Sequence, residues 1–338
     1  MNPRIKKILV IRNDKLGDFM LIWPALSYLK KSLPESEITC LINKNYSNIA
    51  SLCPFIDDVI TDQGIFKLKK IIKENKFDAT ISFFSTFRIG YVLKSSGIPI
   101  RLAPATKIAQ FFYNYKLKQR RSKSKKPEHE YNTDLIIEFL EKFNIEEPSQ
   151  MDKPPYLLLD SKKEISFKNE FIREYTIDPE KKIIFIHPGS GGSSKNISLQ
   201  TYATICNGLR KFDNYNFIIH FSKEEKSIAN SLLSLLDSSL NVKLINPTEN
   251  LTNLIYNINV CDVFFSGSTG VLHIAGALNK KTVAFYPRKK SSTNLRWQTI
   301  NDFNNRIEFS DIGGDGKTIS IDTKKTLLDV QKFISHKR

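Results

Sequence analysis

The 338-residue chain has few of the features that mark secreted or membrane-spanning proteins. Its 4 cysteines, Cys40, Cys53, Cys206 and Cys261, lie far apart, without the spacing of a zinc site or a disulfide framework. We therefore expect them to be reduced core residues. No apolar run approaches the roughly 20 residues that cross a bilayer, and no apolar signal segment follows the first residue. The sequence predicts a cytoplasmic protein.

Signatures of metal binding and of nucleotide hydrolysis are also absent. The chain has no Asp-x-Asp pair, no cluster of His and carboxylate residues and no phosphate loop of the NTPase type. We expect neither a metal nor a cofactor.

Acidic residues are scarce relative to basic ones, 35 against 51, which gives a formal charge of +16. This charge predicts an anionic partner, such as a nucleic acid, a phosphorylated glycan or an acidic membrane surface, although compositional bias alone also scatters lysines. The densest region is a basic block at residues 116–126, which contains no acid. Such a block repels itself, so we expect a loop that stays mobile until an anion orders it.

Short apolar runs alternate with helical patterns along both halves of the chain. Strands are expected at 8–11, 37–42, 58–60, 77–83, 182–187, 216–221, 242–245, 262–265 and 282–286. Helices are expected at 19–29, 46–52, 65–74, 131–143, 199–212, 224–236, 251–257, 271–278 and 323–334. A polar stretch with three prolines, 146–155, indicates a linker. The alternation predicts an α/β protein with two doubly wound parallel sheets.

Three loops follow apolar strands, and ligands gather at the carboxyl ends of such strands. The first, 12–18, ends in Gly17-Asp18, and Asp18 either caps the next helix or faces a cleft. The second, 189–195, is rich in Gly and Ser and ends in Lys195. Its backbone N–H groups and lysine suit a phosphate, although an ordinary surface turn has the same composition.

The third loop, 266–270, leads into an apolar helix. Thr269 and Gly270 fall at the helix N-terminus, whose free N–H groups favour an anion. His273 falls in the first turn, where a histidine more often packs or caps than catalyses. Two loops suited to anions in one half, opposite a carboxylate from the other, favour a nucleotide diphosphate in an interdomain cleft.

Three segments resemble, in the same order, the signatures of glycosyltransferase family 9, the heptosyltransferase family of lipopolysaccharide assembly. They are Gly17-Asp18 with the Trp-Pro-Ala-Leu that follows, His187-Pro-Gly-Ser with Lys195 downstream, and Ser268-Thr-Gly-Val-Leu-His273. The resemblance extends over nearly the whole chain. It implies a GT-B fold, with two Rossmann-like domains that face each other across a cleft. These are an acceptor-binding domain at 1–155, a nucleotide-sugar donor-binding domain at 156–322, and a C-terminal helix at 323–338 that packs back toward the first domain.

The same resemblance implies roles for single residues. Asp18 matches the family's catalytic base, and Lys195 matches its donor-phosphate lysine. The donor-binding positions as a set are Ser190, Gly191, Lys195, Ser268, Thr269, Gly270 and His273. Ser268 departs from the usual Asp, and Asn196 stands where an aromatic or Arg-Trp-Pro element commonly follows the lysine. Both departures lie on the donor side, so the sugar and the nucleotide stay open.

We expect an inverting, metal-independent transfer of a sugar, with a heptose from ADP-heptose favoured. The expected acceptor is a lipid-linked lipopolysaccharide core or a related anionic glycan at the cytoplasmic face of the inner membrane, with peripheral membrane contact. Its negative charges are expected to meet Arg101, Arg120, Arg121, Lys123, Lys125 and Lys126.

Three alternatives stay open at this point. One is a glycosyltransferase with another nucleotide sugar, and the second is an epimerase of the same fold that acts on the donor alone. The third is a nucleic-acid-binding protein, whose binding would depend steeply on salt. The aromatic residues around Phe111 are not interleaved with the basic residues as in an RNA-binding motif, so we expect no nucleic acid partner.

Overall fold

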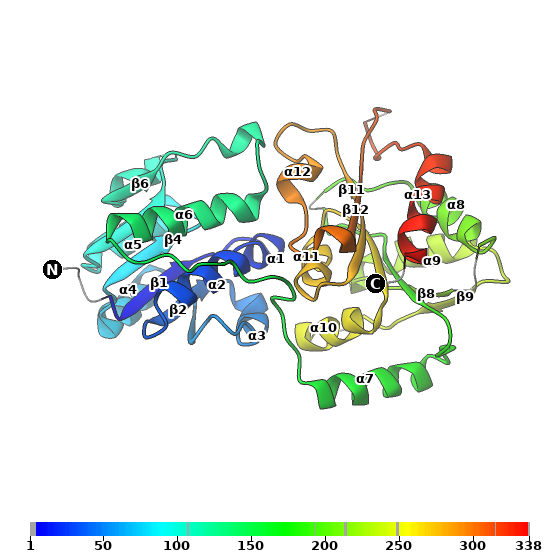
Figure 1. Ribbon diagram of the computed structural model, residues 1–338, viewed down its shortest axis with the longest axis horizontal. Helices are drawn as coiled ribbons and strands as arrows, with labels where there is room; N and C mark the ends of the chain where they lie inside the picture. The colour runs from blue at the N-terminus through cyan, green and yellow to red at the C-terminus, as the bar shows by residue number, and fades with distance from the viewer. Residues whose placement is uncertain are drawn as a thin grey trace. The chain divides into compact units, whose positions relative to one another are not determined.

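The computed structural model describes residues 5–106, 108–192, 194–212, 215–247, 250–314 and 316–336. The chain forms two compact units, Met1–Leu158 and Leu159–Arg338, which are described separately below (Figure 1). The division falls close to the expected boundary at residue 155. Each unit contains a parallel sheet flanked by helices, so the predicted α/β fold with two doubly wound sheets is confirmed.

The first unit is organised around six parallel strands in the order β3-β2-β1-β4-β5-β6. Their bounds are β1 Lys7–Ile11, β2 Glu37–Ile42, β3 Asp58–Thr61, β4 Ala79–Ser82, β5 Ile100–Pro104 and β6 Tyr115–Leu117. The chain winds outward in one direction from β1 to β3 and in the other direction from β4 to β6. The carboxyl ends of β1 and β4 therefore form the switch point, where open α/β sheets bind their ligands.

Helices cover the sheet of the first unit. They are α1 Leu16–Met20, α2 Trp23–Ser32, α3 Ser47–Ala50, α4 Ile65–Asn75, α5 Phe87–Ser95 and α6 Glu128–Lys142, with 3₁₀ turns η1 Lys44–Tyr46, η2 Ile108–Phe112 and η3 Arg121–Lys123. Helices α2 and α6 pack against each other (Figure 1). Leu9 and Ile11 of β1 share a core with Leu68 and Ile72 of α4, which lie four residues apart and so on one helix face. This core also holds the inner face of α5.

The second unit repeats this arrangement with the order β12-β11-β10-β7-β8-β9. Its strands are β7 Ile183–His187, β8 Asn216–Ile219, β9 Asn241–Leu244, β10 Val263–Gly267, β11 Lys281–Tyr286 and β12 Arg306–Ser310. Its helices are α7 Ser161–Glu174, α8 Leu199–Leu209, α9 Lys226–Leu235, α10 Leu251–Val260, α11 Gly270–Ala277, α12 Asn294–Trp297 and α13 Thr323–Ser335, with turns η4 Lys223–Glu225 and η5 Phe303–Asn305. Here the switch point lies between β7 and β10.

Several elements escaped the sequence prediction, namely α5, β5, β6, α7, α12 and β12. The expectation of a mobile loop at 116–126 is wrong for part of this range. Its start belongs to β6, which pairs with β5, and Arg121–Lys123 forms η3. The basic block is held because Arg121 finds an acidic partner, Glu128, just beyond the block.

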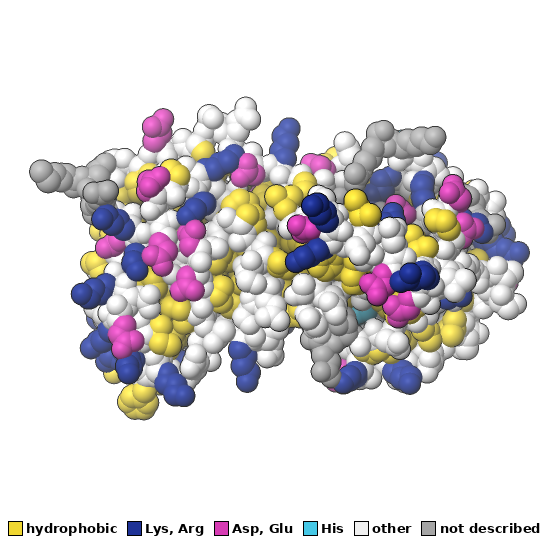
Figure 2. Space-filling model, turned by 90° about the horizontal axis from the view of Figure 1, so that it is seen from below, with side chains coloured by type: hydrophobic (Ala, Val, Ile, Leu, Met, Phe, Trp, Pro, Cys, Tyr) yellow, Lys and Arg dark blue, Asp and Glu magenta, His cyan; other side chains and the backbone are white. Residues whose placement is uncertain are grey.

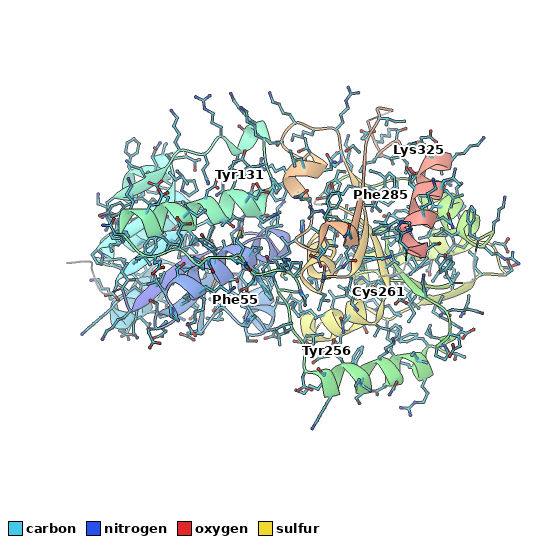
Figure 3. The ribbon with its side chains drawn as sticks, in the orientation of Figure 1. Phe55, Tyr131, Tyr256, Cys261, Phe285 and Lys325 are labelled. Carbon is cyan, nitrogen blue, oxygen red and sulfur yellow. The ribbon has the colours of Figure 1, made fainter. Side chains whose placement is uncertain are left out.

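Buried features of the second unit agree with the sequence prediction. All four cysteines of the chain are buried and free, and Cys261 lies in the interior of the second unit, as does Phe285 (Figure 3). Helix α13 forms where expected and packs against α8, with Val330 and Ile334 in the core of this unit. Its expected packing toward the first domain stays a prediction. Among the described residues, no helix combines the length and the apolar character that crossing a membrane requires.

Candidate active site

A buried arginine occupies the switch point of the first unit. Arg12 directly follows β1 and is only 3 % exposed. Its Nη1 donates to the backbone oxygen of Phe83, directly after β4, at 3.3 Å. The guanidinium therefore bridges the carboxyl ends of β1 and β4, the two parallel strands between which the strand order switches.

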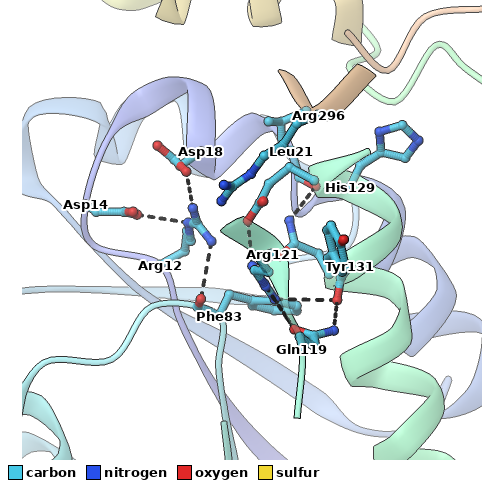
Figure 4. Close-up of polar contacts among 12 residues, drawn as sticks. Arg12, Asp14, Asp18, Leu21, Phe83, Gln119, Arg121, His129, Tyr131 and Arg296 are labelled. Atoms are coloured by element: carbon cyan, nitrogen blue, oxygen red, sulfur yellow. Dashed lines mark hydrogen bonds and ion pairs between the residues drawn. The ribbon is translucent and has the colours of Figure 1, made fainter. Parts of the chain in front are cut away.

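Arg12 also binds two carboxylates of the loop that follows β1 (Figure 4). Its Nε lies 2.9 Å from Oδ1 of Asp14, and its Nη2 donates to Oδ1 of Asp18. Asp18 lies in the first turn of α1, but the N-cap of this helix is Lys15, and no side chain caps it. The cap interpretation of Asp18 is therefore wrong, because its carboxylate meets a guanidinium rather than the free N–H groups of the helix.

Burial and charge act against each other in this cluster. Burial alone would lower the pKa of Arg12, but the carboxylates of Asp18 and Asp14 outweigh it and raise that pKa. Burial raises the pKa of Asp14 to about 6; Arg12 opposes this shift, and the charge of Asp18 adds to it. Asp18 keeps 14 % of its side chain exposed. Asp14 is similarly half-buried, with 16 % of its side chain exposed, so both carboxylates of the cluster keep partial access to solvent.

A polar hollow of about 520 Å³ lies beside this loop. Its lining includes Asn13, Asn43, Lys44, Asp62 and Arg88, which follow β1, β2 and β3 or lie on α5. Arg88 donates to Asp62 through Nη1 at 3.0 Å, and Asn13 donates to the same carboxylate at 3.2 Å. Amide, carboxylate and ammonium groups of this kind bind hydroxyl groups. The sequence interpretation missed this hollow, since its residues come from four separate segments.

In the second unit, two of the predicted donor loops lie side by side because β7 and β10 are adjacent strands. Asn196 joins them: its Nδ2 donates to the Pro188 oxygen at 2.9 Å, and a Cβ on Gly267 would lie 2.9 Å from its side chain. Its Oδ1 accepts from Tyr202 at 3.0 Å. Asn196, which departs from the family pattern, therefore anchors the loops to each other.

The Gly-rich loop is held by a carboxylate that the sequence interpretation missed. Oε1 of Glu225 accepts from the backbone N–H of Gly191 at 2.9 Å. Gly189 lets this carboxylate approach the backbone, because a Cβ at this position would lie 2.1 Å from it and would displace the Glu225 side chain. Nearby, the Nδ1 atoms of His187 and His220 lie 3.2 Å apart, and both rings are buried. Burial, helped by the neighbouring His187, lowers the pKa of His220 to about 3, so this pair is neutral at physiological pH.

Each remaining donor residue lies at the same edge of the second sheet. Thr269 is the N-cap of α11 and is buried, with its Oγ1 3.2 Å from Oγ of Ser266. Gly270 begins the helix, and His273 is buried in its first turn. Lys195 is exposed and donates to the Gly316 oxygen. Ser190 and Ser268 flank these groups, one in each loop, and are half-buried.

The basic residues expected to bind the acceptor separate into two groups. Arg101 and Arg121 are used inside the unit: Nε of Arg101 donates to the Phe112 oxygen at 2.9 Å, and Arg121 pairs with Glu128. Arg121 also donates to Asn132, whose amide reaches the Leu21 oxygen after α1 (Figure 4). The second group, Arg120, Lys123, Lys125 and Lys126, lines a cavity of about 520 Å³ in the same unit, together with Lys118, which was not among the expected residues.

The second wall of this cavity is α6, which contributes Tyr131, Asp134, Glu138 and Glu141. Lys126 pairs with Asp134 and lies over the Tyr131 ring at 5.2 Å. The cavity is therefore basic on one side and acidic on the other. The acceptor roles of its residues, and of Arg101 and Arg121, stay predictions.

A family model of glycosyltransferase family 9, the heptosyltransferases, matches residues 65–309. A Haemophilus influenzae protein provisionally named a glycosyltransferase is 40 % identical over 98 % of this chain and 97 % of its own length. The chain belongs to glycosyltransferase family 9. The lipopolysaccharide core heptosyltransferase OpsX of the same organism is 21 % identical over 83 % of this chain and 79 % of its own.

Solved structures share the fold of this family 9 enzyme. Escherichia coli ADP-heptose lipopolysaccharide heptosyltransferase II superimposes with a TM-score of 0.77, at 18 % identity, over 97 % of this chain and 98 % of its own. The predicted GT-B fold and family resemblance are confirmed, and the enzyme is a glycosyltransferase. The matched range begins after the loop that contains Asp18, so the role of that residue stays a prediction.

Proposed function

We propose that this glycosyltransferase moves a heptose from ADP-heptose to a lipopolysaccharide core or a related anionic, lipid-linked glycan, with inversion and without a metal. The observation that carries the proposal is the Arg12–Asp18 pair at the switch point of the first unit, where the ends of β1 and β4 meet. The name of the similar E. coli enzyme includes ADP-heptose, and that of OpsX includes the lipopolysaccharide core.

In this mechanism Asp18 is the general base. Its carboxylate takes the proton of an acceptor hydroxyl, whose oxygen forms a bond to the anomeric carbon as the bond from that carbon to the leaving diphosphate breaks. Arg12 binds one oxygen, Oδ1, so the second oxygen of Asp18 is the one available to the acceptor. A positioned base typically contributes about 10²–10⁴-fold in rate. The polar hollow beside Asn13 offers amide and carboxylate groups to the hydroxyls of the acceptor sugar.

The second unit holds the donor. The N-terminus of α11 at Thr269 and Gly270 and the ammonium of Lys195 stabilise the negative charge that grows on the leaving diphosphate. Ser190, Gly191, Ser268 and His273 complete the donor loops. Ser268 and Asn196 depart from the family pattern in the donor loops, so the choice of ADP as the nucleotide needs a direct test.

The acceptor's acidic groups meet the basic side of the cavity formed by Lys118, Arg120, Lys123 and Lys125. A lipid-linked acceptor also requires the enzyme to work in peripheral contact with the inner membrane surface.

A donor screen tests the nucleotide. Thermal-shift measurements with ADP-, UDP-, GDP- and CMP-sugars should give the largest stabilisation with an ADP-sugar, because only ligands that bind the native state raise the midpoint. Lys195→Ala should reduce that shift, and Lys211→Ala, a change at an exposed lysine of the second unit outside the donor loops, should leave it unchanged. A larger shift with UDP- or GDP-sugars would contradict the ADP assignment while leaving the transfer itself in place.

A further inference from the structure

The first unit presents aromatic side chains to solvent on two adjacent helices. Phe66 on α4 is 90 % exposed, and Phe87 on α5 is 62 % exposed. A third ring, Phe111 on η2, is 72 % exposed, and Ile108, three residues earlier in the same turn, is 68 % exposed. Single exposed apolar residues need no explanation, but several on neighbouring elements form a patch that calls for one.

The elements that carry these side chains are packed together. Helix α4 contacts α5, and α5 contacts η2. The Phe112 ring lies edge-on to Phe87 at 4.9 Å and to Tyr91 at 6.4 Å, and so fixes η2 against α5. Gly90 permits this close approach, because a Cβ there would lie 2.7 Å from the Phe112 ring. The orientation of the patch is thus built into the unit.

On both helices a lysine lies seven residues after an exposed phenylalanine. On α4, Phe66, Lys70 and Lys73 occupy positions i, i+4 and i+7, and all three are exposed. These positions share one helix face. The inner face of the helix holds Leu68 and Ile72, which are buried.

Helix α5 repeats the pattern with Phe87, Tyr91 and Lys94, again at i, i+4 and i+7 and again exposed. Lys69 of α4 lies over the Tyr91 ring at 6.0 Å, which links the two helices. Lysines outnumber acids here: the two helices contain Lys67, Lys69, Lys70, Lys73 and Lys94, with Glu74 as their one acidic residue.

Phe66 and Phe87 lie in the first turns of the two helices, whereas Lys73 and Lys94 lie in the last turns. Helices α4 and α5 start just after β3 and β4, so their first turns lie at the carboxyl edge of the sheet, the edge at which Arg12 and Asp18 are found. The aromatic end of the patch is therefore at the same edge of the unit as the candidate base. On the face of the molecule drawn in Figure 2, basic, acidic and exposed hydrophobic side chains are interspersed.

We infer that this aromatic–lysine patch, formed by α4, α5 and η2, docks on an anionic lipid bilayer. Aromatic rings enter the headgroup region, and lysines extend their charges to anionic headgroups, which is the composition of helices that lie on a membrane surface. A nucleic acid is disfavoured, because these rings project singly from helix ends rather than forming a stacking platform along a basic groove. The inference goes beyond the proposed function, since it names the docking surface and requires no particular donor or acceptor.

Vesicle co-sedimentation at physiological ionic strength tests the inference. The full chain should bind vesicles of phosphatidylcholine with phosphatidylglycerol and stay in the supernatant with phosphatidylcholine alone. Changing Phe66, Phe87 and Phe111 together to Ser should lower the partition coefficient by on the order of tenfold or more. Changing Lys67, Lys70 and Lys73 to Gln should produce a similar loss and remove the preference for phosphatidylglycerol.

A matched control changes Ile165, Phe303 and Ile312, which are 64 %, 80 % and 63 % exposed in the second unit, to Ser. This control should bind vesicles as the unchanged protein does. Phe66→Ser alone, at the most exposed position, provides a variant with an undisturbed core and should give an intermediate loss.

Three results would overturn the inference. They are a wild-type chain that ignores phosphatidylglycerol vesicles, an aromatic variant that binds as well as wild type, and tighter patch-dependent binding to an RNA oligomer than to vesicles. No result depends on catalysis, so a failure of the proposed function would be seen separately, as an absence of sugar transfer.

Discussion

Arg12 and Asp18, six residues apart in the chain, form an ion pair at the switch point of the first sheet, where the strand order changes between β1 and β4. The guanidinium also binds Asp14 and the end of β4, and it is almost completely buried. One cation thus orients the candidate base and neutralises a second carboxylate beside it.

Removing the Arg12 side chain should therefore destabilise the first unit. Arg12→Met leaves Asp14 and Asp18 without their shared cation, and breaking a buried pair from one side typically costs about 3–5 kcal/mol. Arg12→Lys retains the charge but not the three-way geometry, so a smaller loss is expected. Urea unfolding of the three proteins at pH 7 measures both. A loss below about 1 kcal/mol for Arg12→Met would mean that the cluster is not coupled as described.

Asp14 gives the cluster a defined pH dependence. Its carboxyl has a pKa of about 6 in the folded chain against an ordinary value of 3.8, mainly because of burial. Between these values the native state binds more protons than the unfolded state, so this group's contribution to stability falls as the pH rises from about 4 to about 6 and is constant above. Asp14→Asn lacks this contribution.

The measurement is the free energy of unfolding of wild type minus that of Asp14→Asn, taken at several values between pH 4 and pH 8. The difference should decrease as the pH rises from 4 to about 6 and then level off. An increase would place the folded-state pKa of Asp14 below its ordinary value. Asp57→Asn serves as a comparison outside the cluster, because Asp57 pairs with the ammonium group of Lys30 instead of with Arg12.

The basic block should show two different kinds of effect. Arg120→Gln with Lys123→Gln and Lys125→Gln should raise the acceptor KM several-fold with little change in the donor KM, because these residues line the cavity. Arg121→Gln should instead destabilise the enzyme by about 3 kcal/mol, because it breaks a largely buried ion pair with Glu128 from one side. Steady-state kinetics with each substrate varied, together with thermal unfolding, separate the two. If the cavity variants changed the donor KM instead, the acceptor assignment would be wrong.

The sequence predicted most of the architecture because long apolar patterns are local. The strand before Arg12 and the helix at α4 are visible in single windows of the chain. Elements such as β6 and β12 were missed because each is a short, half-buried strand at the edge of its sheet, where the apolar pattern is weak. Asp18 and Lys195 could be singled out from their motifs.

Side-chain partners were harder to predict. Arg12 reads in the sequence as the polar residue that ends a strand, and nothing local reveals that Phe83 is its second partner. Arg121 was grouped with its basic neighbours because a charge count does not distinguish a guanidinium bound to Glu128 from a free one. Glu225 and His220 lie more than 30 residues beyond the loop that they contact. One local signal marks some of these residues: Arg12 and His220 are charged or polar residues that directly follow a strand.

The most direct test of the account is the turnover of Asp18→Asn. The amide keeps the shape of the side chain but cannot accept the acceptor's proton, so kcat should fall by about 10²–10⁴-fold. The affinity for the ADP-sugar, measured by calorimetry, should stay within about twofold of wild type, because the donor loops belong to the other unit. An Asp18→Asn enzyme that retains substantial turnover with the same donor affinity would contradict the assignment of Asp18 as the general base.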